Sequence, residues 1–399
     1  MSKVYRVILS FILPAIFVSA PSRLWALEKV TGANLTADMG FGARQQGMGL
    51  MHSGFQDGAD AVINAPAAMN DVNDLTFSTS HLEQFEAAQF DALSLLIPWH
   101  ADGTLGLAMA RYGVGNIESH NLAALPDSVT GEFSTADWLL SGSFARRFGA
   151  LDLGGTLHLL YRNLGDQSGM GLRADVMGQY TFTGGYRMGV FVRGLVPSTA
   201  KYQSGWTEYE PPEASLFASG LWAFPYFYGN LQAGFETPGL VQQGARSANE
   251  LEGSRAITDP VSLLKTSKAG GEFRFDFGLK IRAGLDELKP STLTSSIRLG
   301  AGYGWKNIVG VDYAFSAHPS LGQSHRVALW WTPSFPKFEG RGFRPHPAGS
   351  PQALEKRAPE AKSSDEEAPS EMEEKGTTPS DEAPPEKTKS RTKEILEDE

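Results

Sequence analysis

The side chains best suited to chemistry are charged residues at every second position in the last third of the sequence. Glu272 and Asp276 flank Arg274 in this pattern. Two nearby carboxyl groups could act as a general acid and a general base. Basic residues occur at the same spacing, which favours a network of ion pairs, and we expect no catalytic residue. The predicted network contains Glu272, Arg274, Asp276, Lys280, Arg282, Arg298 and Asp312.

Other patterns suggest ligand chemistry only weakly. The glycine-rich stretch GARQQGMG, residues 42–49, lacks the lysine and hydroxyl residue that complete a phosphate-binding loop. Asp57, Asp60 and Asn64 carry the oxygen ligands that calcium prefers, but a turn with side-chain hydrogen bonds fits their spacing better. The eight histidines form no zinc-type pair. We therefore predict no metal, no cofactor and no enzymatic activity.

Composition limits the compartment and the partners. The chain has 399 residues, no cysteine and a net charge of −10. Residues 351–399 hold 15 acidic and 8 basic residues, six prolines and no aromatic residue. Such a segment cannot bury a core, and we predict a disordered acidic tail over residues 336–399. No basic patch with interleaved aromatic residues is present, so we expect no nucleic-acid partner.

The first residues have the pattern of a secretory signal. Lys3 and Arg6 precede the apolar run VILSFILPAIFVSA, and small residues at Ala20 and Ala26 offer cleavage points. The run is too short for a membrane span, and a signal peptide over residues 1–26 is predicted. An N-terminal anchor helix is the alternative.

Alternating apolar and polar residues then predict an all-β body over residues 73–335. The expected strands are about as long as a tilted strand that crosses a bilayer. They cover residues 73–81, 88–97, 103–112, 136–147, 151–162, 170–182, 186–195, 214–223, 227–236, 268–276, 278–286, 294–304, 307–316 and 323–333.

The connections between these strands favour a membrane barrel. Every even-numbered connection is short, whereas long ones, such as 113–135, 196–213 and 237–267, are all odd-numbered. Short periplasmic turns and long extracellular loops around an even number of strands are typical of outer-membrane barrels. In such a barrel apolar residues face lipid and polar residues face the lumen. We therefore expect Asp312 to point inward and Val311 and Tyr313 to face lipid. A soluble periplasmic β protein is the alternative.

Two stretches resemble a known family. Residues 40–69 resemble the opening of FadL-like and PorV/PorQ-like outer-membrane proteins, although Ala65 interrupts the usual Asn-Pro-Ala element. The stretch around "DYAF" and "SHR" looks like the C-terminal hairpin of the PorV/PorQ family. The first motif comprises Gly42, Arg44, Gly47, Gly49, Asp57, Asp60, Asn64 and Pro66. The second comprises Asp312, Tyr313, Gly322, His325 and Arg326.

The resemblance implies a 14-stranded antiparallel transmembrane β-barrel in the cell outer membrane, with residues 27–72 folded into the lumen as a hatch. Family members are accessories of protein export, such as type IX secretion, or passive channels for hydrophobic molecules. Dense inward charge favours the export accessory, and the FadL-like channel is the alternative. The expected partners are outer-membrane lipid, the barrel-assembly machinery, and secreted cargo proteins or hydrophobic ligands.

Overall fold

A computed structural model describes residues 40–51, 58–85, 88–99, 102–120, 129–205, 207–210, 212–242, 264–288, 297–318 and 322–333. The predicted signal peptide, the acidic tail and Asp57 lie outside these residues. None of the helices described is both long and apolar enough to span a membrane.

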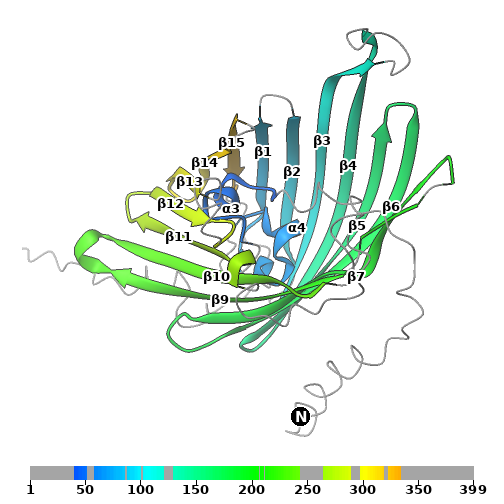
Figure 1. Cartoon of the computed structure of the whole chain (residues 1–399). Coiled ribbons are helices and arrows are strands. Elements are labelled where there is room, and N and C mark those ends of the chain that lie inside the picture. The colour runs from blue at the N-terminus through cyan, green and yellow to red at the C-terminus, as the bar shows by residue number, and fades with distance from the viewer. Residues whose placement is uncertain are drawn as a thin grey trace, which may run out of the picture. The chain divides into compact units, whose positions relative to one another are not determined.

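Antiparallel strands build the body of the protein (Figure 1). Fourteen of them correspond one to one to the expected strands. The strands are β1 (Thr76–Gln84), β2 (Ala88–Trp99), β3 (Gly103–His120), β4 (Val129–Phe148), β5 (Leu151–Leu164), β6 (Gln167–Thr181), β7 (Arg187–Tyr202), β8 (Thr207–Glu210), β9 (Glu213–Phe224), β10 (Gly229–Gln242), β11 (Lys268–Phe275), β12 (Leu279–Leu285), β13 (Ile297–Trp305), β14 (Val309–His318) and β15 (Gly322–Trp331).

The sheet closes on itself. Apart from β8, each strand pairs with its neighbours along the chain, β7 pairs with β9, and β1 pairs with β15. The short strand β8 pairs with β7 alone, so fourteen strands form the ring and β8 extends one hairpin. Closure pairs both edges of every strand in the fourteen-stranded ring that the structure describes, as a backbone surrounded by lipid requires.

The two faces of the wall have opposite polarity. Along β14, Val311 and Tyr313 are 42% and 40% exposed, whereas Asp312 between them is 6% exposed. On β12, Ile281 is exposed and Arg282 is buried in the same alternation. An apolar outer face and a buried polar inner face are the arrangement of a membrane barrel, so the predicted inward direction of Asp312 is confirmed.

The predicted loop over residues 113–135 is wrong in part. Strand β3 continues to His120, and β4 already begins at Val129. Strands β7 and β8 likewise occupy much of the predicted loop over residues 196–213. Residues 115–120 and 129–134 are mostly exposed on both faces. A strand that is wet on both sides needs no apolar alternation, which is why the pattern missed these extensions. Figure 1 shows β3 to β6 rising well beyond β10 to β15.

Short helices from the N-terminal part lie inside the ring. They are α3 (Ala43–Gly47), α4 (Ala61–Asn64) and the 3-10 helix η2 (Pro66–Asp71). A second 3-10 helix, η3 (Pro225–Phe227), forms the turn between β9 and β10. Every residue of α3 and α4 is buried. We refer to residues 40–51 and 58–72, the described part of the expected hatch, as the hatch.

Candidate functional site: the lumen and its hatch

Glu272 on β11 is the centre of the buried ion-pair network. Its carboxylate lies 3.0 Å from Arg44 of the hatch, 2.7 Å from Arg274 and 2.5 Å from Arg282. Arg282 also reaches Asp312 on β14 at 2.7 Å. The alternation that places acidic and basic residues on one face of each strand therefore brings them together in the lumen. It also attaches α3 to the wall.

A second cluster holds the other end of the hatch. Asp71, the last residue of η2, is paired with Arg147 on β4 and Arg187 on β7. These two guanidinium groups hold the pKa of Asp71 below its ordinary value, despite its burial. Arg147 also binds Asp152 at 2.7 Å. No sequence pattern predicted this cluster, because Asp71, Arg147 and Arg187 are far apart in the chain.

Asp60 of the hatch lies in the field of Arg44 and Asp312 of the first cluster. It is half-buried, accepts a hydrogen bond from Ser78 on β1 at 3.1 Å, and lies against Gly42 so closely that a Cβ there would overlap its carboxylate. Burial, opposed by the Ser78 hydrogen bond and helped by the charge of Asp312, raises the pKa of Asp60 to about 6. Asp60 therefore takes up a proton at a higher pH than an ordinary aspartate, in contrast to Asp71.

Glycines in the wall make room for the hatch backbone. A Cβ on Gly270 or Gly284 would overlap the carbonyl of Met48, and one on Gly47 would lie 3.1 Å from the Cα of Gly300. Gly49 has a φ of +77°, which glycine adopts without strain. The glycine-rich hatch sequence thus fits a glycine-rich part of the wall, as tight packing inside a barrel requires.

The remaining hatch residues make structural contacts. Asn64 donates to the side chain of Gln45 at 2.5 Å and not toward Asp60, so the structure does not assemble the two as ligands of one cation. Pro66 begins η2, and its carbonyl group lies against Gly154 of β5.

The C-terminal hairpin motif divides between the two faces of the wall. His325 lies on the outer face and its ring nitrogen is 2.7 Å from the Tyr313 hydroxyl. Arg326 points into the lumen, where it donates to the Gly40 carbonyl at 2.5 Å. His325 and Asp312 therefore lie on opposite sides of the wall, because adjacent strand residues such as His325 and Arg326 face opposite sides. Gly322 begins β15 with a φ of +96°.

Two charged residues of the predicted network lie away from its centre. Arg298 pairs with Asp286 at the other end of β12 and β13. Asp276 lies at the turn after β11, on the rim of a cavity described below. The network therefore has a compact core around Glu272, which sequence alternation alone could not distinguish from its periphery.

Sequence reasoning missed an apolar region inside the lumen. Ten of the larger side chains in one buried cluster come from β1, β2, β4, β5, β7 and the hatch. They are Phe41, Val62, Ile63, Met69, Leu82, Phe90, Leu96, Leu139, Leu160 and Tyr202. A second cluster joins Ala65, Ala67 and Ala68 of the hatch to Met177, Phe191 and Phe217. The charged network thus occupies the β11 to β15 side of the lumen, and the apolar clusters lie mainly along β1 to β7.

Strand β7 is irregular between these two apolar clusters. Its pairing with β6 shifts between Val192 and Val196, and its pairing with β9 stops at Arg193 before β8 continues from Ser198. Gly194 has a φ of +64°, and its N–H donates to the Asp175 side chain at 2.7 Å. Ladder bonds are therefore interrupted on both sides of β7 at one level of the wall, which is the signature of a β-bulge.

Asp175 is the last member of a chain of buried polar contacts. The Ser141 hydroxyl lies 2.8 Å from Nδ1 of His158, and Nε2 of His158 lies 3.2 Å from Asp175. This composition matches a hydrolase triad, which the sequence spacing did not reveal. Neighbouring strands use the backbone N–H groups around Ser141 in their ladder, and Ser141 is 1% exposed. Arg173 also donates to Asp175 at 2.7 Å, and we interpret the chain of contacts as a support for Gly194.

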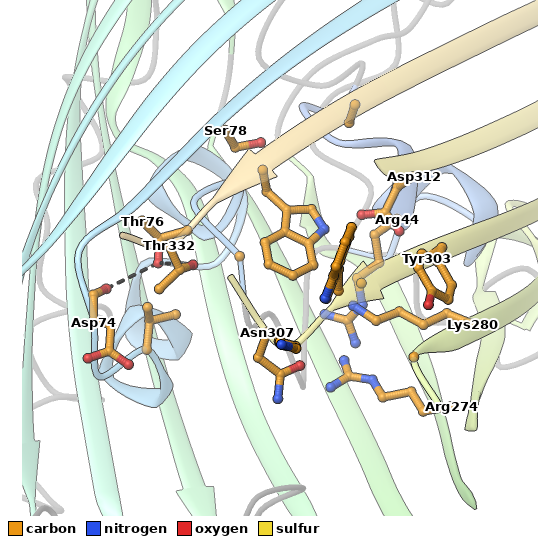
Figure 2. A pocket seen from close by; sticks show the side chains of 18 of the residues that line it. Arg44, Asp74, Thr76, Ser78, Arg274, Lys280, Tyr303, Asn307, Asp312 and Thr332 are labelled. Atoms are coloured by element: carbon orange, nitrogen blue, oxygen red, sulfur yellow. Dashed lines mark hydrogen bonds between the residues drawn. The ribbon is translucent and has the colours of Figure 1, made fainter. Parts of the chain in front are cut away.

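A cavity of about 590 Å³ opens at the end of the barrel where β1 begins and β15 ends. Its wall includes Arg44 and Asp60 of the hatch and the turn ends of β11 to β14. Figure 2 shows Arg44, Arg274 and Lys280 converging on one side of it, with Asp74 on the other. We call it the turn-end cavity.

The closed ring, the apolar outer face and the polar lumen define an outer-membrane β-barrel. No protein-family model matches the chain, and no curated protein is similar in sequence. Among solved structures it is similar to the toluene transporter TodX of Pseudomonas putida, at 12% identity and a TM-score of 0.47 over 73% of this chain and 96% of that one. It is also similar to the toluene transporter TbuX of Ralstonia pickettii, at 12% identity and a TM-score of 0.46 over 73% of this chain and 98% of that one. A FadL homologue of Pseudomonas aeruginosa is similar at 11% identity and a TM-score of 0.44 over 73% of this chain and 98% of that one.

Proposed function

We propose that this protein is a passive channel for small hydrophobic molecules across the outer membrane. The observation that carries the proposal is the apolar part of the lumen beside the irregular part of β7. Tyr202 of the first apolar cluster and Phe191 of the second lie on either side of the bulge in the same strand. A porin for polar solutes has a polar, water-filled lumen and gains nothing from such a lining.

The irregular stretch of β7 also carries exposed apolar side chains. Leu195 and Val196 are each 47% exposed on the outside of the wall. Where ladder bonds are already interrupted, less backbone bonding must break for a molecule to pass between the lumen and the bilayer. A hydrophobic solute would therefore leave sideways through the wall at this level, after a shift of the hatch.

Uptake by a hatch variant tests the channel. Asn64→Ala removes the hydrogen bond to Gln45 inside the hatch, and Asn163→Ala on the exposed part of β5 is the matched control. We expect Asn64→Ala to change the initial uptake rate of a radiolabelled aromatic hydrocarbon in cells and proteoliposomes, with Asn163→Ala unchanged. Equal rates for both variants and the parent would refute the channel.

A scaffold for protein export to the cell surface, as in the PorV/PorQ group, is the second candidate. It is favoured by the two ion-pair clusters that hold the hatch, one at Arg44 and one at Asp71. A lumen held closed in this way suits a protein whose outer surface does the work. A deletion strain that loses a defined set of surface proteins, which then accumulate in the periplasm, would establish this function. An unchanged surface proteome would exclude it.

A further inference from the structure

The turn-end cavity has the size of a small-molecule site. Its volume of about 590 Å³ lies inside the range of roughly 300 to 1,000 Å³ that is usual for ligand pockets. Hatch residues form one part of its wall, and the start of β1 and the ends of β10 to β15 form the rest. The chemistry of these side chains decides which ligand would bind.

One side of the cavity carries an excess of positive charge. Arg44, Arg274 and Lys280 line it, and Arg282 lies directly behind. Glu272 and Asp312 form ion pairs with Arg44, Arg274 and Arg282 of this group. Cations are therefore concentrated on this side of the cavity, whereas Asp74 and Asp276 lie at its rim. Such a concentration of positive charge attracts an anion.

The other acidic residues around the cavity have their own neutralising neighbours or lie at its rim. Asp71 is paired with Arg147 and Arg187, and Asp60 lies in the field of Arg326. The rim carries one basic residue, Lys306, and two acidic residues, Asp74 and Asp276. The rim is therefore slightly acidic, and the concentration of positive charge is confined to the Arg274 side.

An aromatic ring lies beside the positive side. The parity of Trp330 on β15 turns its side chain toward the lumen, where it lines the cavity. Its indole lies across Gly304 and Gly310, where any side chain on Gly310 would overlap it. The ammonium group of Lys280 lies 5.1 Å from the ring centroid. An apolar ring and a cation thus face the same space.

We propose that the turn-end cavity binds an aromatic carboxylate, with its carboxylate on Arg274 and Lys280 and its ring against Trp330. Charge-assisted hydrogen bonds to the anion and stacking on the indole would act together. This ligand class goes beyond the proposed transport of neutral hydrophobic molecules. Binding at this site can be measured without any transport, so either proposal can fail alone.

Calorimetric titration of the purified full-length protein in maltoside micelles tests the site. The probes are benzoate, benzyl alcohol, which has the ring without the charge, and acetate, which has the charge without the ring. We expect saturable binding of benzoate, at least about tenfold weaker binding of the other two, and weakening of benzoate binding by added salt. Equal affinity for benzoate and benzyl alcohol, or no saturable benzoate binding, would overturn the proposal.

Two variants locate the binding on the protein. Lys280→Met keeps the apolar stem and removes the charge, and Lys201→Met removes an exposed charge on β7 as the control. We expect Lys280→Met to weaken benzoate binding at least about tenfold and Lys201→Met to leave it unchanged. The heat-dependent shift in gel mobility verifies that each barrel is folded. A folded Lys280→Met protein with the parent's affinity would refute the assignment, and if that variant does not fold, the comparison of probes on the parent protein still decides.

Discussion

The ion pair between Arg44 and Glu272 predicts how firmly the hatch is held. Glu272→Gln keeps the shape of the side chain and removes its charge. Three guanidinium groups, those of Arg44, Arg274 and Arg282, then lose their common carboxylate in a site where Glu272 is 0% exposed. The hatch should therefore leave its closed position far more often.

The size of the effect follows from the burial of the group. Removing one partner of a buried ion pair typically costs about 3 to 5 kcal/mol, because the remaining charge stays buried. The lower end of that range corresponds to roughly a hundredfold rise in the equilibrium constant for opening. We expect a change of that order if Arg44 separates from the wall as the hatch opens.

Because the sequence contains no cysteine, the opening of the hatch can be followed by labelling one introduced thiol. Met48→Cys places a single thiol in the hatch at a position that is 7% exposed in the parent. The rate at which a water-soluble maleimide modifies this thiol reports the opening equilibrium. Glu272→Gln in this background should raise the labelling rate by roughly a hundredfold.

An exposed ion pair supplies the matched control. Arg146 and Asp102 are paired at 3.0 Å with side chains 54% and 45% exposed. Asp102→Asn should change the labelling rate by no more than about threefold, since exposed pairs contribute little. Arg44→Met added to Glu272→Gln should have less than the sum of the two single effects. Equal labelling of the Glu272→Gln and Asp102→Asn proteins would refute the idea that this network holds the hatch.

Three further predictions follow from the hatch and the β7 bulge. Gly284→Ala should lower the midpoint of thermal unfolding in micelles by an amount equivalent to about 1 to 3 kcal/mol, because its Cβ would overlap the Met48 carbonyl. Gly142→Ala, with no atom within 4 Å of its new Cβ, should not. Burial raises the pKa of Asp60 from 3.8 to about 6, so the folded state binds more protons than the unfolded state between those values. The free energy of unfolding should therefore fall by up to about 3 kcal/mol as the pH rises through that window, and the Asp60→Asn protein, measured by denaturant titration, should lack this component. Asp175→Ala removes the acceptor of the Gly194 N–H, so amide hydrogen exchange around Gly194 should accelerate at least about tenfold, and an unchanged exchange rate would show that the bulge needs no such support.

The alternation of apolar and polar residues in the sequence was sufficient to predict the architecture. A strand has a side-chain period of two, so the pattern around Asp312 and Arg282 already separates a lumen face from a lipid face. Short connections on one parity and long ones on the other then predict a closed, even-numbered ring, and the structure contains that ring. Its fourteen strands correspond to the expected ranges, apart from the extended ends of β3 and β4 and the short strand β8.

Only the tertiary structure decided which inward residues meet. Arg44 and Glu272 are 228 positions apart, and Asp71 reaches Arg187 across 116 positions. Alternation states which face a side chain occupies, but not its height in the barrel or what lies opposite. Those depend on the stagger between strands and on the path of the hatch, which are set by the closed ring as a whole.

The same reason explains the features that sequence reasoning missed. Leu139 is an inward apolar residue of β4 between the inward polar residues Asp137 and Ser141, so that strand alone gave no sign of an apolar lumen. The contact of Asp175 with Gly194 depends on the β7 bulge. The direction of the Trp330 side chain depends on strand parity at that one position. The sequence determined the local period, and therefore a barrel with a charged lumen. The closed ring determined the neighbours, and therefore where a ligand could bind.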